Sequence, residues 1–163
     1  MTVFPHEMKH KHIPENKIPE LEEKVFLLYN LFYKYNWKYC DLRTVSERGM
    51  GKNPTRRPKL CIKIGQACLI AGFQRGDNVF VRVQGRDIII RKDQYGCLFK
   101  IGGNHYGTNI VLSPILLALG YKKGDWVIVL AKEEEIRIRD AVIEFKKLDR
   151  YLKKVREIGL LTL

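Results

Sequence analysis

The chain has 163 residues, of which 45% are hydrophobic, enough for one packed domain with terminal extensions. Thirty Lys and Arg residues oppose eighteen Asp and Glu residues, and the resulting net charge of +12 favours a polyanionic partner. No apolar run approaches the ~18 residues of a membrane span, and the N-terminus has no apolar signal core. We therefore expect a cytoplasmic protein without a membrane partner, and nucleic acid is the better candidate polyanion.

Residues 1–18 are rich in proline and histidine, lack periodicity and predict a flexible arm. The arm contains His6-Glu7-Met8-Lys9-His10, which matches the H-E-x-x-H zinc pattern by letter. That chemistry needs both histidines on one face of a stable helix, whereas Pro5 and Pro14 bracket a short polar stretch here. The four cysteines are scattered without a C-x-x-C pair. We expect no metal and no cofactor.

Residues 19–40 predict an N-terminal helix. Pro19 suits a first helical turn, and Leu21, Val25, Leu28 and Phe32 recur at helical spacing. This segment is dense in aromatic residues, namely Tyr29, Phe32, Tyr33, Tyr35, Trp37 and Tyr39. They fit either stacking on nucleic-acid bases or packing against the rest of the domain, and packing is the more common use of such a stripe.

Residues 43–63 concentrate positive charge, with seven Lys and Arg residues against Glu47 alone. The balance of +6 is half of the net charge of the chain. Glycine and proline in the same stretch indicate a loop. We take its basic residues as the candidate nucleic-acid-binding residues: Arg43, Arg48, Lys52, Arg56, Arg57, Lys59 and Lys63.

The segment Ile62 to Arg91 recurs without a gap as Ile110 to Arg139, 48 residues further on. Ten of the thirty aligned pairs are identical: Ile62/Ile110, Leu69/Leu117, Gly72/Gly120, Gly76/Gly124, Asp77/Asp125, Val79/Val127, Val81/Val129, Ile88/Ile136, Ile90/Ile138 and Arg91/Arg139. So short a repeat cannot close a core alone, and we expect the copies to complete one another around a pseudo-twofold axis.

Each repeat is predicted as strand, short helix, strand, turn, strand, preceded by one more strand of a hairpin. The short helices are expected at 66–71 and at 114–119, with Ser113 as N-cap of the second. Gly102-Gly103-Asn104 predicts the turn of the second hairpin, and the basic loop occupies the corresponding place in the first. The predicted fold class is α+β, mainly β, with copy one at 41–93 and copy two at 94–139.

Gly76-Asp77 and Gly124-Asp125 each stand between a short basic link and a β-branched strand. Glycine adopts the positive φ of a tight turn, and aspartate accepts the backbone N–H groups that the turn leaves open. Neither aspartate has a second carboxylate or a histidine nearby in sequence. We expect a structural turn at both sites rather than catalysis.

The run Leu119-Gly120-Tyr121-Lys122-Lys123-Gly124-Asp125-x-Val127, followed by Ile136-x-Ile138-Arg139, resembles the AbrB/MazE/SpoVT swapped-hairpin family. Copy one shows the pattern less cleanly, from Ala71 to Val79. The resemblance covers about residues 42–139 and implies a β-barrel of two interlocking β-β-α-β-β halves, here supplied by one chain. It also implies duplex DNA binding in transcriptional regulation, or an antitoxin role, through arginines of the first hairpin.

Residues 140–163 predict a C-terminal helix with an apolar stripe at heptad-like spacing, which includes Phe145, Leu148, Leu152 and Val155. The stripe fits a homodimer through this helix or packing on the barrel within one chain.

The expected function is a duplex-DNA-binding protein, sequence-specific or general, acting as a transcriptional regulator. A protein-interaction or scaffold barrel, or an antitoxin-like protein that binds a partner, is the alternative, and RNA binding is a third reading. The sequence shows no catalytic nucleophile set, no paired carboxylates and no phosphate-cradling loop, so we do not expect an enzyme.

Overall fold

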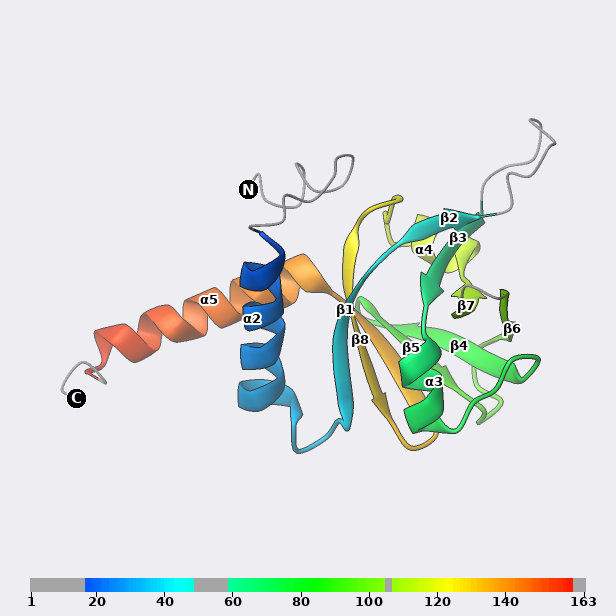
Figure 1. Cartoon of the computed structure of the whole chain (residues 1–163), viewed down its shortest axis with the longest axis horizontal. Coiled ribbons are helices and arrows are strands. Elements are labelled where there is room, and N and C mark those ends of the chain that lie inside the picture. The colour runs from blue at the N-terminus through cyan, green and yellow to red at the C-terminus, as the bar shows by residue number, and fades with distance from the viewer. Residues whose placement is uncertain (1–16, 49–58, 105–106, 160–163) are drawn as a thin grey trace.

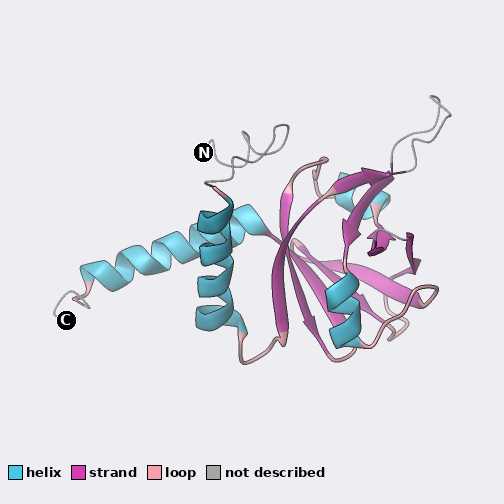
Figure 2. Ribbon diagram, in the orientation of Figure 1, coloured by secondary structure: helices cyan, strands magenta, loops and turns pink. Residues whose placement is uncertain are grey.

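The computed structural model describes residues 17–48, 59–104 and 107–159. They form an α+β, mainly β fold, in which nine antiparallel strands make a nearly closed barrel and helices stand at both ends of the chain (Figures 1 and 2). The predicted fold class is confirmed at this level. The strands are β1 (Tyr39–Thr44), β2 (Ser46–Arg48), β3 (Lys59–Lys63), β4 (Asn78–Gln84), β5 (Asp87–Arg91), β6 (Cys97–Asn104), β7 (Gly107–Val111), β8 (Trp126–Lys132) and β9 (Glu135–Asp140). The helices are α2 (Ile18–Leu28), the π-helical turn η1 (Tyr29–Tyr33), α3 (Gly65–Ala71), α4 (Ser113–Ala118) and α5 (Ala141–Glu157).

The sheet curls into a nearly closed barrel because β1 and β2, the first and last strands of its spatial order, follow one another directly in the sequence. The strands follow the order β1-β8-β9-β5-β4-β6-β7-β3-β2. Only Val45 separates β1, which pairs with β8, from β2, which pairs with β3. One run of ten residues, 39–48, therefore borders both sides of the seam.

Strands related by the repeat interval pair with each other. Ile62 of β3 lies opposite Ile110 of β7, and Ile89 of β5 lies opposite Arg137 of β9. In both pairs the partners stand 48 residues apart (62 to 110 and 89 to 137), the interval of the sequence repeat. The first strands pair across the halves as well, β1 with β8 and β6 with β4.

Each Gly-Asp turn clasps a strand that belongs to the other half of the chain. The N–H of Gly124 donates to the carbonyl of Val45 at 2.7 Å, and the N–H of Val45 donates to the carbonyl of Asp125 at 2.9 Å. Gly76 and Asp77 make the same two bonds with Ile101, again at 2.7 and 2.9 Å. The turns thus satisfy the backbone groups of the crossing strand where it bends from one side of the barrel to the other.

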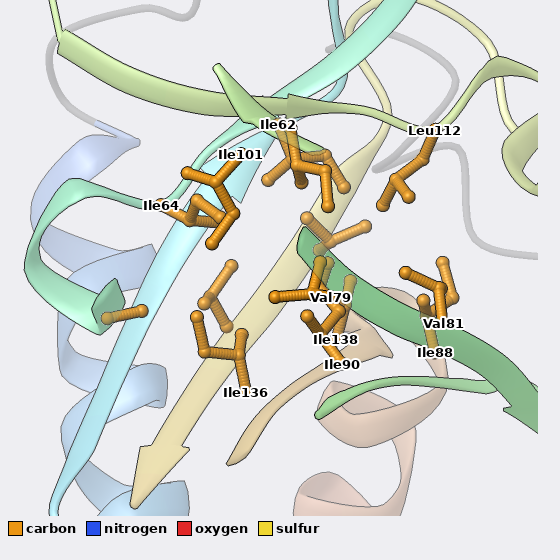
Figure 3. Close-up of a cluster of buried hydrophobic side chains, with 14 of the residues drawn as sticks. Ile62, Ile64, Val79, Val81, Ile88, Ile90, Ile101, Leu112, Ile136 and Ile138 are labelled. Carbon is orange, nitrogen blue, oxygen red and sulfur yellow. The ribbon is translucent and has the colours of Figure 1, made fainter. Parts of the chain in front are cut away.

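Apolar side chains from both halves fill the barrel (Figure 3). Ile62, Ile88, Ile110, Ile136 and Ile138 are all 0% exposed. Alternation along each strand sends these side chains inward, and their polar neighbours face out. Nine of the ten identical pairs of the repeat lie in the barrel core, in its turns or at the end of its strands, whereas Leu69 and Leu117 are exposed on α3 and α4.

A second apolar layer joins the two terminal helices to the outside of the barrel. Leu21 and Leu28 of α2 and Phe145 and Leu148 of α5 pack with Ile128 of β8, and all five are buried. Asp140 caps α5 by accepting the N–H of Ile143 at 3.2 Å. The helix then runs past α2 and projects from the body of the protein (Figure 1).

Three local predictions differ from the structure. Gly102 and Gly103 lie inside β6 rather than in a turn. A glycine is needed at position 103 because a Cβ there would meet the carbonyl oxygen of Gly107 at 2.5 Å. Ser113 does not cap α4; its hydroxyl accepts the N–H of Leu60 at 2.8 Å, and Leu112 holds the cap position. The N-terminal helix gives way to the π-helical turn after Leu28, before the expected end.

Replacing Gly76 by alanine should destabilise the fold by about 1–2 kcal/mol, because Gly76 has a φ of +89° that residues with a Cβ adopt at a cost. Gly65 is the matched control: a Cβ there also meets nothing within 4 Å, and its φ is ordinary. Gly65→Ala should be neutral or slightly stabilising. Urea unfolding of both variants measures the difference, and equal losses would contradict the role given to the turn.

Candidate nucleic-acid interface

Three of the seven basic residues singled out in the sequence lie together on the outer face of β2 and β3. Leu60 and Ile62 of β3 point into the barrel core, so the alternating Lys59 and Lys63 point outward. Arg48 of β2 lies opposite Lys59 and faces the same way. Lys52, Arg56 and Arg57 belong to the segment 49–58, outside the described residues, which connects Arg48 to Lys59 in the chain.

Arg48 is held in place across the neighbouring strands. Its Nη1 donates to Oδ1 of Asn109 on β7 at 2.7 Å. Between them lies Cys61, which faces outward and yet is only 4% exposed. Burial raises the pKa of the Cys61 thiol, and nearby Arg48 and Lys63 partly oppose that shift. Arg48 is therefore a positioned guanidinium rather than a free surface side chain.

β6, β7, β3 and β2 are neighbours in the sheet. Lys100 of β6 also faces outward, because it alternates with the inward-facing Phe99 and Ile101, but it pairs with Asn78 of β4, before the bend at Ile101 beyond which β6 pairs with β7. Lys100 is therefore not counted with Arg48, Lys59 and Lys63. Glu47, the one acidic residue in these four strands, lies on the opposite face. No ion pair joins a carboxylate to Arg48, Lys59 or Lys63 within residues 17–48, 59–104 and 107–159. We call Arg48, Lys59 and Lys63 the basic face.

Arg43 lies apart from the basic face. It points to the inner side of β1, where Nη1 pairs with Oδ2 of Asp41 at 2.5 Å and Nη2 donates to the hydroxyl of Tyr39 at 3.3 Å. Burial, with Asp41 nearby, raises the pKa of Tyr39 to about 12. The Asp41 carboxylate offsets the charge of Arg43, and the structure does not group it with the other basic residues.

The second half of the chain lacks the basic face. Forty-eight residues after Lys59 and Lys63 stand Gly107 and Val111, in the paired strand β7. The two halves share the apolar positions and differ in charge. Alternation and the repeat interval could have added Asn109 to the candidate residues, since it follows once β7 is placed beside β3.

The aspartates of the two turns hold backbone groups of their own turns. Oδ2 of Asp77 accepts the N–H of Gln74 at 2.8 Å, and Oδ2 of Asp125 accepts the N–H of Lys122 at 2.9 Å. Oδ2 of Asp77 also accepts a hydrogen bond from Lys92, which lowers the pKa of the Asp77 carboxyl. These contacts fit a structural role for both turns.

The apolar stripe of the C-terminal helix is divided between two environments. Phe145 and Leu148 are 3% and 0% exposed because α2 and β8 cover them within the same chain. Leu152 is partly buried at the edge of that layer, and Val155 is half-exposed on the projecting part of α5. Phe145 and Leu148 are therefore covered within the chain, and Leu152 and Val155 are the members of the stripe that stay accessible to a second chain.

Most aromatic residues of the N-terminal segment serve packing. Tyr33 and Trp37 are buried, and Tyr29 packs against the same layer. The hydroxyl of Tyr33 donates to Glu144 of α5, which also pairs with Arg139. Tyr35 differs, because its side chain is 89% exposed.

Comparison of the chain with protein-family models, with curated proteins and with solved structures found no match. None of the helices within the described ranges is long and apolar enough to cross a membrane. The same ranges contain no group of three or more His, Cys, Asp or Glu side chains that could hold a metal ion, and the H-E-x-x-H stretch lies outside them. The geometry of the basic face is therefore the main guide to function.

Leu148→Ala should destabilise the chain by about 2–5 kcal/mol, because it removes a fully buried side chain between α5 and the barrel. Val155→Ala, on the projecting part of the same stripe, should cost less than about 1 kcal/mol. Urea unfolding at two protein concentrations measures both. Similar, concentration-dependent losses would instead place the whole stripe between two chains.

Proposed function

We propose that the protein binds duplex DNA through the basic face and acts as a transcriptional regulator. The observation that carries the proposal is a surface of β2 and β3 with three outward-facing cations and no outward-facing carboxylate. The segment that joins Arg48 to Lys59 adds Lys52, Arg56 and Arg57 and no acidic residue. Phosphate groups along a duplex are the natural partner of such a one-signed surface.

The shape of this region also suits a duplex. β2 and β3 form a two-stranded antiparallel ribbon at the edge of the body (Figure 1). The major groove of B-DNA admits a two-stranded ribbon. Lys59 and Lys63 would neutralise phosphates. Arg48, oriented by Asn109, and the arginines at 56 and 57 are the candidates for contacts with guanine edges.

The proposal includes a family relation. We propose that the chain is a single-chain AbrB/MazE/SpoVT-like barrel whose two swapped hairpins are β1–β2–β3 and β6–β7. The pairing of Ile62 with Ile110 and the matched bonds at Val45 and Ile101 support it, because both are what a pseudo-twofold arrangement requires. Since one half only is basic, one chain would contact one half-site.

A second chain would supply the second half-site. We propose that the distal half of α5 pairs two chains, since Val155 and the 81% exposed Ile158 extend the apolar stripe beyond Leu152, which lies at the edge of the layer formed with α2. A homodimer of this kind would present two basic faces to one duplex.

Titration with duplex DNA at several salt concentrations tests the proposal. Each lysine–phosphate contact contributes about 0.9 to the slope of log K against log salt. The double variant Lys59→Gln, Lys63→Gln should therefore lower the slope by roughly 1.8. The matched control is Lys146→Gln, Lys153→Gln, which removes two exposed lysines from α5 and leaves the same net charge.

Three results would contradict the proposal. They are no binding at low salt, equal losses in the two double variants, and a preference for RNA in direct competition with the DNA duplex. A stable complex with a protein that survives high salt and does not involve the basic face would favour the scaffold or antitoxin alternative.

Sedimentation equilibrium tests the dimer separately. Val155→Lys should shift the chain from dimer to monomer, because it places a charge in the proposed seam. Its unfolding free energy per chain should stay close to that of the unchanged protein measured as a monomer. An unchanged protein that is monomeric at high micromolar concentration would overturn the seam.

A further inference from the structure

A pocket of about 410 Å³ lies at the other end of β1 from the basic face. Lys34, Tyr35, Asn36, Trp37 and Lys38, which connect η1 to β1, form one side of it. Lys132 and Glu133, in the turn between β8 and β9, form the other side. β1 leads from this pocket to β2, so the length of β1 separates the pocket from the strands that carry Arg48 and Lys59.

Tyr35 gives the pocket a free aromatic surface. It is 89% exposed, whereas Trp37 two residues later is 6% exposed. The Nζ of Lys34 lies 5.5 Å from the centre of the Tyr35 ring. An exposed ring can stack on a planar group, and a cation beside the ring can contact a negatively charged substituent of that group.

Trp37 positions the cations behind Tyr35. The Nζ of Lys132 lies 4.8 Å from the centre of the Trp37 ring, and the guanidinium carbon of Arg137 lies 5.5 Å from it. The contact with Trp37 holds the Lys132 ammonium at the pocket without neutralising its charge. Arg137 is committed to Asp87 and Glu135, whereas no ion pair involves Lys34 or Lys132 within the described ranges.

The one carboxylate of the pocket is weakly committed. Glu133 pairs with Lys38, and both side chains are largely exposed, at 76% and 61%. The hydrogen bond from Lys38 lowers the pKa of Glu133, so the carboxyl is ionised at neutral pH. Exposed ion pairs of this kind contribute little to stability, and a competing anion can take over the lysine.

We propose that this pocket binds a nucleobase attached to a phosphate group, with the base stacked on Tyr35 and the phosphate contacted by Lys34, Lys132 and Lys38. The ligand is a free nucleotide or the end of a single-stranded nucleic acid, which share this chemistry. The site is separate from the basic face and does not depend on the proposed duplex binding. Most aromatic residues of the N-terminal segment thus pack within the protein, and Tyr35 would contact the ligand.

Calorimetric titration of the full chain with AMP, adenosine and a short single-stranded oligonucleotide tests the proposal. AMP should bind saturably and adenosine much more weakly, because adenosine lacks the phosphate. Tyr35→Ala should weaken AMP binding roughly tenfold. Tyr95→Ala is the matched control, since Tyr95 is 70% exposed and lies outside the pocket.

Glu133→Gln gives the sharper test, because it predicts a gain. Removal of the carboxylate frees Lys38 and reduces repulsion of the phosphate, so AMP should bind several-fold more tightly. Loss of folding cannot produce this result. AMP binding that is absent at low salt, equal for AMP and adenosine, or unchanged in both Tyr35→Ala and Glu133→Gln would overturn the site.

The comparison of AMP with the oligonucleotide identifies the source of the ligand. Tighter binding of the oligonucleotide than of AMP indicates a nucleic-acid end, and the reverse indicates a free nucleotide. The variant Lys59→Gln, Lys63→Gln should keep the affinity for AMP. If duplex binding fails while AMP binds as described, only the proposed function falls, and the converse result removes only this pocket.

Discussion

The fold depends on the backbone clasp between each Gly-Asp turn and the strand that crosses it. Val45 and Ile101 stand where a strand leaves one side of the barrel and joins the other, and each has its N–H and carbonyl bonded to a turn of the opposite half. Neither half satisfies these groups by itself. The bonds join backbone groups only, and they fix both the crossing point and the register of the strands on either side. With the crossing points fixed, the isoleucine-rich strands of the two halves pack their inward-facing side chains into one shared core.

The sequence predicts those parts of the fold that local chemistry and the repeat determine. Gly76, Gly124 and the alternating strands follow from φ requirements and from period-two burial. The π-helical turn after Leu28 and the hydrogen bond from Leu60 to Ser113 do not, because both are set by elements distant in sequence. The sequence predicts a turn at Gly103, whereas this glycine lies in β6 and allows the close approach of the Gly107 backbone, a contact that no local pattern encodes.

The candidate site was predictable only in part, for the same reason. Charge clustering in sequence found Lys59 and Lys63, but it also collected Arg43, which sits on the other face of its strand beside Asp41. It could not find Asn109, which is 61 residues from Arg48 in the sequence and hydrogen-bonded to it across the sheet. Strand pairing, rather than sequence proximity, decides which charges share a surface. The two halves therefore keep a common scaffold while their outer faces diverge.

The pairing of β1 with β8 has a consequence for how the chain folds. Tyr39 lies opposite Ala131, so the seam joins residues separated by most of the chain. Closing so long a loop carries a large entropic cost before any contact offsets it, and folding rates fall as contacts become less local. During synthesis β1 can pair with β8 only after the residues up to Lys132 have been made. Until then the edge of β1 is unpaired, and an unpaired strand edge in a partly folded chain is prone to aggregation.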